Sequence, residues 1–335
     1  MRLENVLALT DAKLLNKPSI SSFNSISLKL SNLKRGDLFI ANNPQDIQEA
    51  IRLGAYGVIF DSQANISDVE IAWMHVSSVK DALSKILRFH LLNKNISIYE
   101  CDEITLKLAT QITSSKEVVV IGGDIYNAFE ILWNNDHVSL LLFLDSFEYK
   151  NIFISIKVFP KITPCKINII EQTLFETSFI YDNIFYERKL LSPFFIPYLE
   201  NILQLFKNEK IQYNISSFNI KNHFQAVFIN NNLEEKEFGS SEKVLIFEPS
   251  FQPILSQIEF LKRQAGWAKI IYIIPAYRQN KFTDLTNILT YNTKLDIINT
   301  IKTVDFHFAL IAEQNALLLK ENLIIKQPKQ LTLDL

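Results

Sequence analysis

One short segment near the N-terminus, residues 38–60, constrains the fold more than any other part of the chain. Residues 38–41 form an apolar run typical of a buried strand, and Asn43 and Pro44 follow as residue types that cap and begin helices. Apolar residues at helical spacing come next, and residues 56–60 form a second apolar run. This order predicts a right-handed β-α-β unit with parallel strands.

Strand and helix patterns alternate along the rest of the chain. Helices are expected at residues 78–92, 102–113, 195–207, 253–265, 284–301 and 312–322, with a short one ending at Trp133. Strands are expected at residues 117–121, 138–144, 152–159, 225–230, 243–247, 269–274 and 304–310, and a hairpin at 174–191. The alternation predicts an α/β protein whose last part is a doubly wound parallel sheet.

Length and charge bound the class of protein. A chain of 335 residues predicts two or three domains. The net charge of −2 and the scattered Lys and Arg side chains give no surface suited to nucleic acid or anionic lipid. No apolar run approaches the ~18 residues of a membrane span, and acidic residues interrupt the first eleven residues before a signal-like core forms. We therefore expect a cytoplasmic protein without nucleic-acid partners or membrane insertion.

The two cysteines fit a reducing compartment. Cys101 and Cys165 stand far apart and in no C-x-x-C arrangement, so neither a disulfide framework nor a zinc site is expected. We interpret both as buried thiols. The five histidines also have no metal-ligand spacing, and no metal site is predicted.

The glycine pair Gly122-Gly123 lies where a nucleotide phosphate loop would lie. It follows an apolar run and precedes an amphipathic stretch, but none of the chain's seven glycines is followed by Lys. A working loop needs that Lys on the phosphates and a Ser or Thr on Mg²⁺. Asp124 comes next instead and would repel phosphate. We interpret the position as a degenerate phosphate loop, and expect no bound cofactor and no catalytic residue there.

The N-terminal segment resembles that of the Mur ligases, the ligases that build peptidoglycan precursors. The resemblance rests on Gly36-Asp37-Leu38-Phe39 and on the later Gly54-Ala55-Tyr56-Gly57-Val58. It is greatest to the branch of the family that adds D-alanyl-D-alanine to the UDP-muramoyl-tripeptide. The resemblance implies an N-terminal domain at residues 1–100, a reduced central ATPase-like domain at 101–212 and a Rossmann-like domain at 213–335.

The motifs that handle nucleotides in this family are altered here. Lys29-Leu30-Ser31 replaces the family's Asp-Ser-Arg stretch, so the resemblance does not carry over a uridine contact. Residues 121–127 replace Thr-Gly-x-x-Gly-Lys-Thr, and residues 133–191 contain no counterpart of the family's Asn-Asn-Glu or Glu-x-Gly segments. Residues 247–253 correspond to the family's Asp-x-Tyr-x-x-x-Pro stretch, keeping the proline but not the acid.

The altered motifs favour a non-catalytic protein over an enzyme. We expect a binding or scaffold partner in cytoplasmic peptidoglycan synthesis or cell-shape control, and the alternative is a divergent ATP-dependent amide ligase. For a partner surface the sequence offers the proline-bounded aromatics Phe194, Phe195 and Tyr198. The alternative for these rings is simple core packing, because exposed apolar patches are rarer than buried ones.

Overall fold

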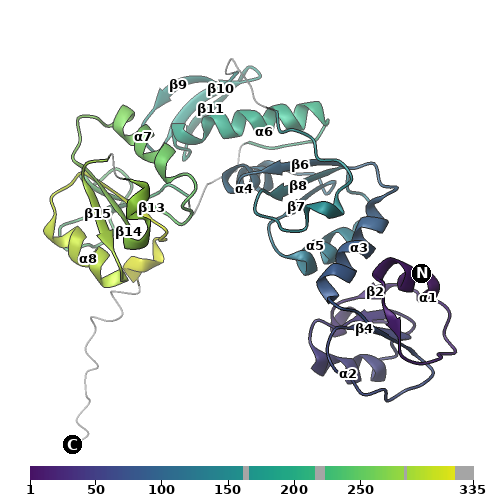
Figure 1. The fold of residues 1–335 in the computed structure, drawn as a ribbon. Helices are drawn as coiled ribbons and strands as arrows, with labels where there is room; N and C mark the ends of the chain where they lie inside the picture. Colours follow the sequence, from purple (N-terminus) through teal and green to yellow (C-terminus); the bar gives the residue numbers. More distant parts are fainter. Residues whose placement is uncertain (161–165, 216–222, 283–284, 321–335) are drawn as a thin grey trace, which may run out of the picture. The chain divides into compact units, whose positions relative to one another are not determined.

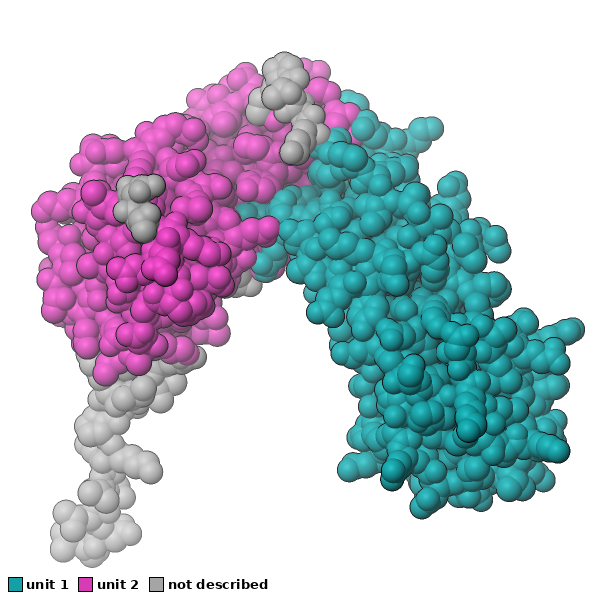
Figure 2. Space-filling view, viewed as in Figure 1, with its two compact units in different colours: residues 1–106, 113–160, 205–213 teal, residues 107–112, 161–204, 214–335 magenta. Residues whose placement is uncertain are grey.

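The computed structural model describes residues 1–160, 166–215, 223–282 and 285–320. The chain divides into two compact units, shown in different colours in Figure 2. Unit 1 comprises residues 1–106, 113–160 and 205–213, and unit 2 comprises residues 107–112, 161–204 and 214–335. The three-domain division at residues 100 and 212 stays a prediction. Among the described residues, no helix is long and apolar enough to cross a membrane.

Unit 1 begins with a five-stranded sheet in the order β1-β5-β4-β3-β2, parallel except for β1 (Figure 1). Its strands are β1 (Lys13–Leu14), β2 (Ile26–Ser27), β3 (Leu38–Ile40), β4 (Gly57–Phe60) and β5 (Ala72–His75). Its helices are α1 (Leu3–Thr10) and α2 (Ile47–Arg52), with short 3₁₀ turns η1 (Leu30–Asn32) and η2 (Pro44–Asp46). The predicted β-α-β unit is confirmed, since β3 and β4 are parallel and α2 lies between them in the chain.

The helix cap within this β-α-β unit forms as the residue types Asn43 and Pro44 predict. The Asn43 side chain accepts a hydrogen bond of 3.2 Å from the Gln45 N–H, and Pro44 starts the turn that runs into α2. At the other end Gly54 has φ +97°, a left-handed conformation that ends the helix and that other residues adopt at a cost.

A second, three-stranded parallel sheet completes unit 1, in the order β6-β8-β7. Its strands are β6 (Ser97–Cys101), β7 (Val118–Ile121) and β8 (Leu140–Leu144). The helices here are α3 (Val79–Leu91), α4 (Glu103–Ile112) and α5 (Ile125–Trp133), with the 3₁₀ turn η3 (Lys150–Ile152). α4 crosses the unit boundary, which falls after Leu106.

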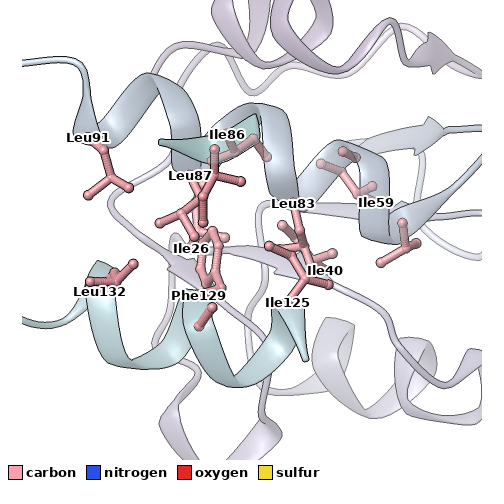
Figure 3. Packing of buried hydrophobic residues seen from close by; sticks show 14 of the residues in the cluster. Ile26, Ile40, Ile59, Leu83, Ile86, Leu87, Leu91, Ile125, Phe129 and Leu132 are labelled. Carbon is pink, nitrogen blue, oxygen red and sulfur yellow. The ribbon is translucent and has the colours of Figure 1, made fainter. Parts of the chain in front are cut away.

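One hydrophobic core joins the two sheets of unit 1. Figure 3 shows the meeting of side chains from the first sheet, from α3 and from α5, among them Ile26, Ile40, Ile59, Leu83, Leu87 and Phe129. The α3 apolar stripe, predicted from helical spacing, is buried in this cluster. Each such side chain contributes ~1.5–3 kcal/mol when fully buried, so the core fixes α5, and with it the loop before α5, to the N-terminal sheet.

The predicted strand at residues 152–159 is wrong. The chain makes only a single bridge there, Lys157 to Tyr99, after η3. Ile152 and Phe153 are both buried although they are consecutive, and Val158 is 90% exposed. A strand needs a neighbouring strand to pair with along its length, and beyond this one bridge the segment has none, so its apolar residues pack without forming a strand.

Unit 2 contains an antiparallel sheet in the order β11-β10-β9, with β9 (Asn168–Gln172), β10 (Thr177–Tyr181) and β11 (Ile184–Lys189). The predicted hairpin is confirmed as β10 and β11. Asp182 and Asn183 form its turn with φ 45° and 63°, the conformation that two-residue hairpin turns require. The turn η4 (Pro193–Phe195) and the helix α6 (Ile196–Asn208) follow, and α6 enters unit 1 after Gln204.

The last sheet has the order β12-β13-β16-β14-β15 and is parallel except for β12, which confirms the predicted parallel sheet. Its strands are β12 (Gln225–Ile229), β13 (Lys243–Glu248), β14 (Ile270–Pro275), β15 (Ile288–Tyr291) and β16 (Phe308–Ala312). Between them lie α7 (Ile254–Gln264), η5 (Ala276–Lys281) and α8 (Lys294–Thr303).

The predicted helix at residues 284–301 is wrong in its first half. Residues Ile288–Tyr291 form the strand β15, and α8 starts only after Thr293. Thr293 and Asp296 form a capping box, each side chain accepting a hydrogen bond from the other residue's backbone N–H. This box fixes the helix start later than the apolar periodicity suggests. Residues 283–284 and the end of the predicted helix 312–322 lie outside the described residues.

Candidate functional site

The strand, loop and helix that resemble a phosphate loop are β7, Gly122-Gly123 and α5. The Asp124 carboxylate Oδ1 accepts a hydrogen bond of 3.0 Å from the backbone N–H of Asn127 and caps α5. A helix N-terminus attracts anions through its free N–H groups and its dipole. Here the chain's own carboxylate lies at that position.

The backbone conformation of this loop does not require glycine, although Gly123 is closely packed against Asn127. Neither glycine has a left-handed φ. A Cβ on Gly122 would lie 3.6 Å from the Leu106 and Leu144 side chains, which is ordinary contact, and one on Gly123 would lie 3.2 Å from Asn127. Phosphate loops use glycine so that backbone N–H groups can surround the phosphates. The loop is therefore an ordinary connection into a capped helix.

No metal-binding arrangement accompanies the loop. In residues 1–160, 166–215, 223–282 and 285–320, no three His, Cys, Asp or Glu side chains are grouped so that they could hold an ion. Of the two predicted buried thiols, Cys101 is buried, and burial raises its pKa to about 12. Cys165 lies outside the described residues.

A polar pocket of about 330 Å³ lies in unit 1 between the N-terminal sheet and α5. Its lining comes from residues 24–28, from Asn32, Lys34, Arg35 and Asp37, and from Phe129, Glu130 and Asn134. Lys29, at the position of the family's uridine stretch, forms an ion pair with Glu130. Lys34 and Arg35 are exposed lining cations. The lining thus combines the two cations Lys34 and Arg35 with the carboxylates of Asp37 and Glu130, of which Glu130 is paired with Lys29.

The Gly36-Asp37 signature has a structural role beside this pocket. Gly36 has φ +95°, and a Cβ there would lie 2.3 Å from Asn24 Nδ2. Asp37 is buried and accepts a hydrogen bond of 3.0 Å from the Lys34 N–H. The two residues hold the turn before β3, which explains why the fold needs them independently of any reaction.

A buried polar network in unit 2 was not anticipated from the sequence. Glu248 ends β13 and is fully buried, and its Oε1 lies 2.6 Å from Nδ1 of the buried His223. Its Oε2 accepts hydrogen bonds from Gln257 Nε2 at 2.6 Å and from the Phe224 N–H at 3.1 Å. Lys107 Nζ lies 2.7 Å from the other imidazole nitrogen. The network connects α4 and α7 to the end of β13.

This network changes the interpretation of residues 247–253. The family resemblance places the family's acid at Phe247, so this acid is missing from the sequence. An acid, Glu248, lies one residue later, but its carboxylate is hydrogen-bonded to other residues of the chain. A charged residue at the end of an apolar strand was the signal, because such residues are almost never fully buried unless paired.

The proposed aromatic partner surface is largely core. Phe194 and Phe195 are 8% and 2% exposed, which contradicts their interpretation as an exposed patch, while Tyr198 is half-buried. Phe194 stacks on Phe224, with centroids 5.8 Å apart, and meets Phe260 edge-on at 5.7 Å. The prolines bound a 3₁₀ turn that directs the two phenylalanines inward to rings of unit 2.

Comparisons with known proteins give structural neighbours but no sequence relatives. No protein-family model matches the chain, and no curated protein matches it. MurF from Acinetobacter baumannii aligns over 97% of this chain and 98% of its own, with a TM-score of 0.56 and 8% identity. The MurF ligase from Thermotoga maritima in complex with ADP aligns over 90% and 96%, with a TM-score of 0.55 and 12% identity.

The structural alignments show the fold, whereas identities of 8% and 12% leave the activity open. The alignments span almost the whole chain, including the parallel sheets of both units and the helices that join them. They agree with the resemblance found in the N-terminal segment. The chain has a divergent Mur-ligase-like fold.

Proposed function

We propose that this protein is a non-catalytic member of the Mur-ligase-like fold and acts as a binding or scaffold partner in cytoplasmic peptidoglycan synthesis or cell-shape control. The fold supports the link to peptidoglycan precursors, because the two structural neighbours reported above are MurF ligases. The altered phosphate loop supports the absence of catalysis.

The observation that carries the proposal is the position of Asp124. Phosphoryl transfer depends chiefly on positive groups that stabilise the charge developing on the phosphates. At the start of α5 the chain presents a carboxylate instead, hydrogen-bonded to the first turn. The loop also contains no Lys and no Ser or Thr hydroxyl for a metal. A triphosphate would meet repulsion there.

The alternative function is that of a divergent ATP-dependent amide ligase. Two observations favour it: the Thermotoga maritima neighbour is in complex with ADP, and the unit 1 pocket has two exposed cations, Lys34 and Arg35. A ligase of this kind would have to bind its nucleotide without the usual loop. The pocket cations also leave binding of a UDP-muramoyl ligand open, with or without catalysis.

A reconstituted ligase assay distinguishes the two functions. The full chain is incubated with ATP, Mg²⁺, UDP-muramoyl-tripeptide and D-alanyl-D-alanine, and phosphate release and ligated product are measured beside an active MurF. We expect neither product from this chain. Writing Gly-Lys-Thr into residues 125–127 should also fail to produce activity, because the family's other central motifs are missing. Turnover by the natural chain would refute the proposal, and turnover by the variant would show that the central motifs are not missing.

The scaffold role needs its own test. Affinity purification of the tagged full chain from its source cell should recover enzymes of peptidoglycan synthesis, in stoichiometric amounts and in repeated preparations. Recovery of proteins from an unrelated process would assign the binding role elsewhere, even if the ligase assay is negative.

A further inference from the structure

A second pocket, in unit 2, shares no lining residue with the sites described above. Its volume is about 600 Å³, within the ~300–1,000 Å³ typical of ligand sites. Five aromatic side chains line it: Phe175, Phe228, Phe238, Trp267 and Phe308. We refer to it below as the aromatic pocket.

The aromatic pocket lies at the amino-terminal end of the parallel strands of unit 2. Val244 and Phe308 come from the first residues of β13 and β16, and Trp267 precedes β14. Phe228 of β12 pairs in register with Val244. Open α/β sheets bind cofactors at the opposite, carboxyl-terminal edge of their strands. The pocket is therefore distinct from the site where this kind of sheet holds a nucleotide.

The aromatic pocket is open to solvent at two of its rings. Trp267 is 76% exposed and Phe238 is 48% exposed. Phe175, from the turn between β9 and β10, lies with its centroid 6.1–6.4 Å from those of Phe228, Phe238 and Phe308. Grouped apolar side chains exposed around a hollow mark binding surfaces in soluble proteins, and tryptophan is enriched among the residues that dominate binding energy.

Negative charge lies beside these rings. Glu242 lines the pocket, is exposed, and forms no ion pair within the part of the chain that the structure describes. Arg188 also lines the pocket, but its Nη2 lies 3.6 Å from Glu176 Oε2, so this charge is balanced. The segment of residues 231–242, which supplies Phe238, contains four glutamates and one lysine. Within this segment Lys236 Nζ lies 3.7 Å from Glu234 Oε2, and the segment as a whole has a formal charge of −3.

We propose that the aromatic pocket binds an apolar side chain of a lysine- or arginine-rich segment of a partner protein. The apolar side chain would lie among the five rings, and the basic residues beside it would lie against Glu242 and the acidic segment. A peptide fits better than a small cation because the acidic residues continue along the chain beyond the pocket lining. The inference supplies a surface for the proposed scaffold role, but it holds whether or not the protein is catalytic.

The test uses a displayed library of random dodecapeptides selected on the immobilised full chain. We expect the selected peptides to combine an apolar or aromatic residue with flanking Lys or Arg. One selected peptide is then synthesised, and its Kd is measured by calorimetry for the wild type and for single variants of the chain.

Matched variants locate the binding surface. Phe238→Ala and Glu242→Lys should each weaken the peptide at least tenfold. Phe185→Ala removes a ring that is 53% exposed but does not line the pocket, and Glu4→Lys reverses an exposed charge in unit 1; both should leave Kd within twofold. Since all four side chains are exposed or half-exposed, the melting temperatures should stay close to that of the wild type.

Several results would overturn the inference. These are selection of no peptide above background, selection of acidic peptides, or a Kd that Phe238→Ala and Glu242→Lys leave unchanged. Displacement of the peptide by tetramethylammonium alone would identify a small-cation site instead. A concentration-dependent dimer that Phe238→Ala dissociates would identify a second copy of this chain as the occupant. None of these results depends on the ligase assay, so failures of the two proposals are distinguishable.

Discussion

The imidazole Nδ1 of His223 lies 2.6 Å from Oε1 of Glu248, and both side chains are excluded from solvent. Lys107 Nζ lies 2.7 Å from the other ring nitrogen. An ammonium group can only donate, so this nitrogen accepts and Nδ1 donates to the carboxylate. The geometry therefore places the imidazole between a carboxylate and an ammonium group.

Removing Glu248 should destabilise the protein strongly. Glu248→Ala leaves the His223 and Gln257 donors buried without their acceptor, and breaking a buried pair costs ~3–5 kcal/mol. We expect the free energy of unfolding, measured by urea titration, to fall by about this amount. Glu259→Ala, at an exposed position on α7, the helix that contains Gln257, should change the free energy of unfolding by less than ~0.5 kcal/mol. Equal effects of the two variants would contradict the buried network.

The carboxylate of Glu209 should make unit 1 sensitive to acid. Burial opposes its ionisation, but hydrogen bonds from Ser97, Tyr99 and Lys157 outweigh burial and hold its pKa below the ordinary 4.5. The unfolded state then binds more protons as the pH falls through this range, so stability rises with pH there. The stabilisation is complete above about pH 5 and is lost as the pH falls below 4.5.

Glu209→Gln isolates this contribution. The stability difference between wild type and Glu209→Gln, from urea titrations at several pH values, should be constant above about pH 5 and shrink below it. A difference that grows as the pH falls would show that the folded-state pKa of Glu209 is raised rather than lowered.

Two glycines with positive φ should differ in their tolerance of alanine. At Gly239 (φ +77°) an added Cβ meets nothing within 4 Å, so Gly239→Ala should cost only the left-handed backbone, ~1 kcal/mol. At Gly36 (φ +95°) the Cβ would also displace Asn24 Nδ2 from its hydrogen bond to the Arg35 carbonyl. Gly36→Ala should cost ~2–3 kcal/mol, and thermal unfolding of both variants checks the order.

The sequence predicted those elements whose signals are local. Asn43 and Pro44 cap and start the turn into α2 through neighbouring residues, and the apolar runs on either side of this turn form the parallel strands β3 and β4. The prediction of a helix from residue 284 was wrong, because the start of α8 depends on hydrogen bonds between Thr293 and Asp296. Apolar periodicity does not indicate these bonds.

The sites were less predictable because they depend on contacts between distant residues. Phe194 is buried by Phe224 and Phe260, which are 30 and 66 positions further along the chain. The rings of the aromatic pocket come from four separate segments, so no single stretch of sequence indicates it. The altered glycine loop could be read from the sequence alone, since its chemistry depends on consecutive residues.

Calorimetric titration of the full chain with ATP and Mg²⁺ tests the central claim most directly. Because Asp124 occupies the start of α5, we expect no binding heat from the wild type. We also expect none from Asp124→Ser, which keeps a helix cap but removes the charge, since the Lys and metal-binding hydroxyl of a phosphate loop would still be missing. No heat from either protein is the result that the account predicts, and micromolar affinity of the wild type for ATP would contradict it.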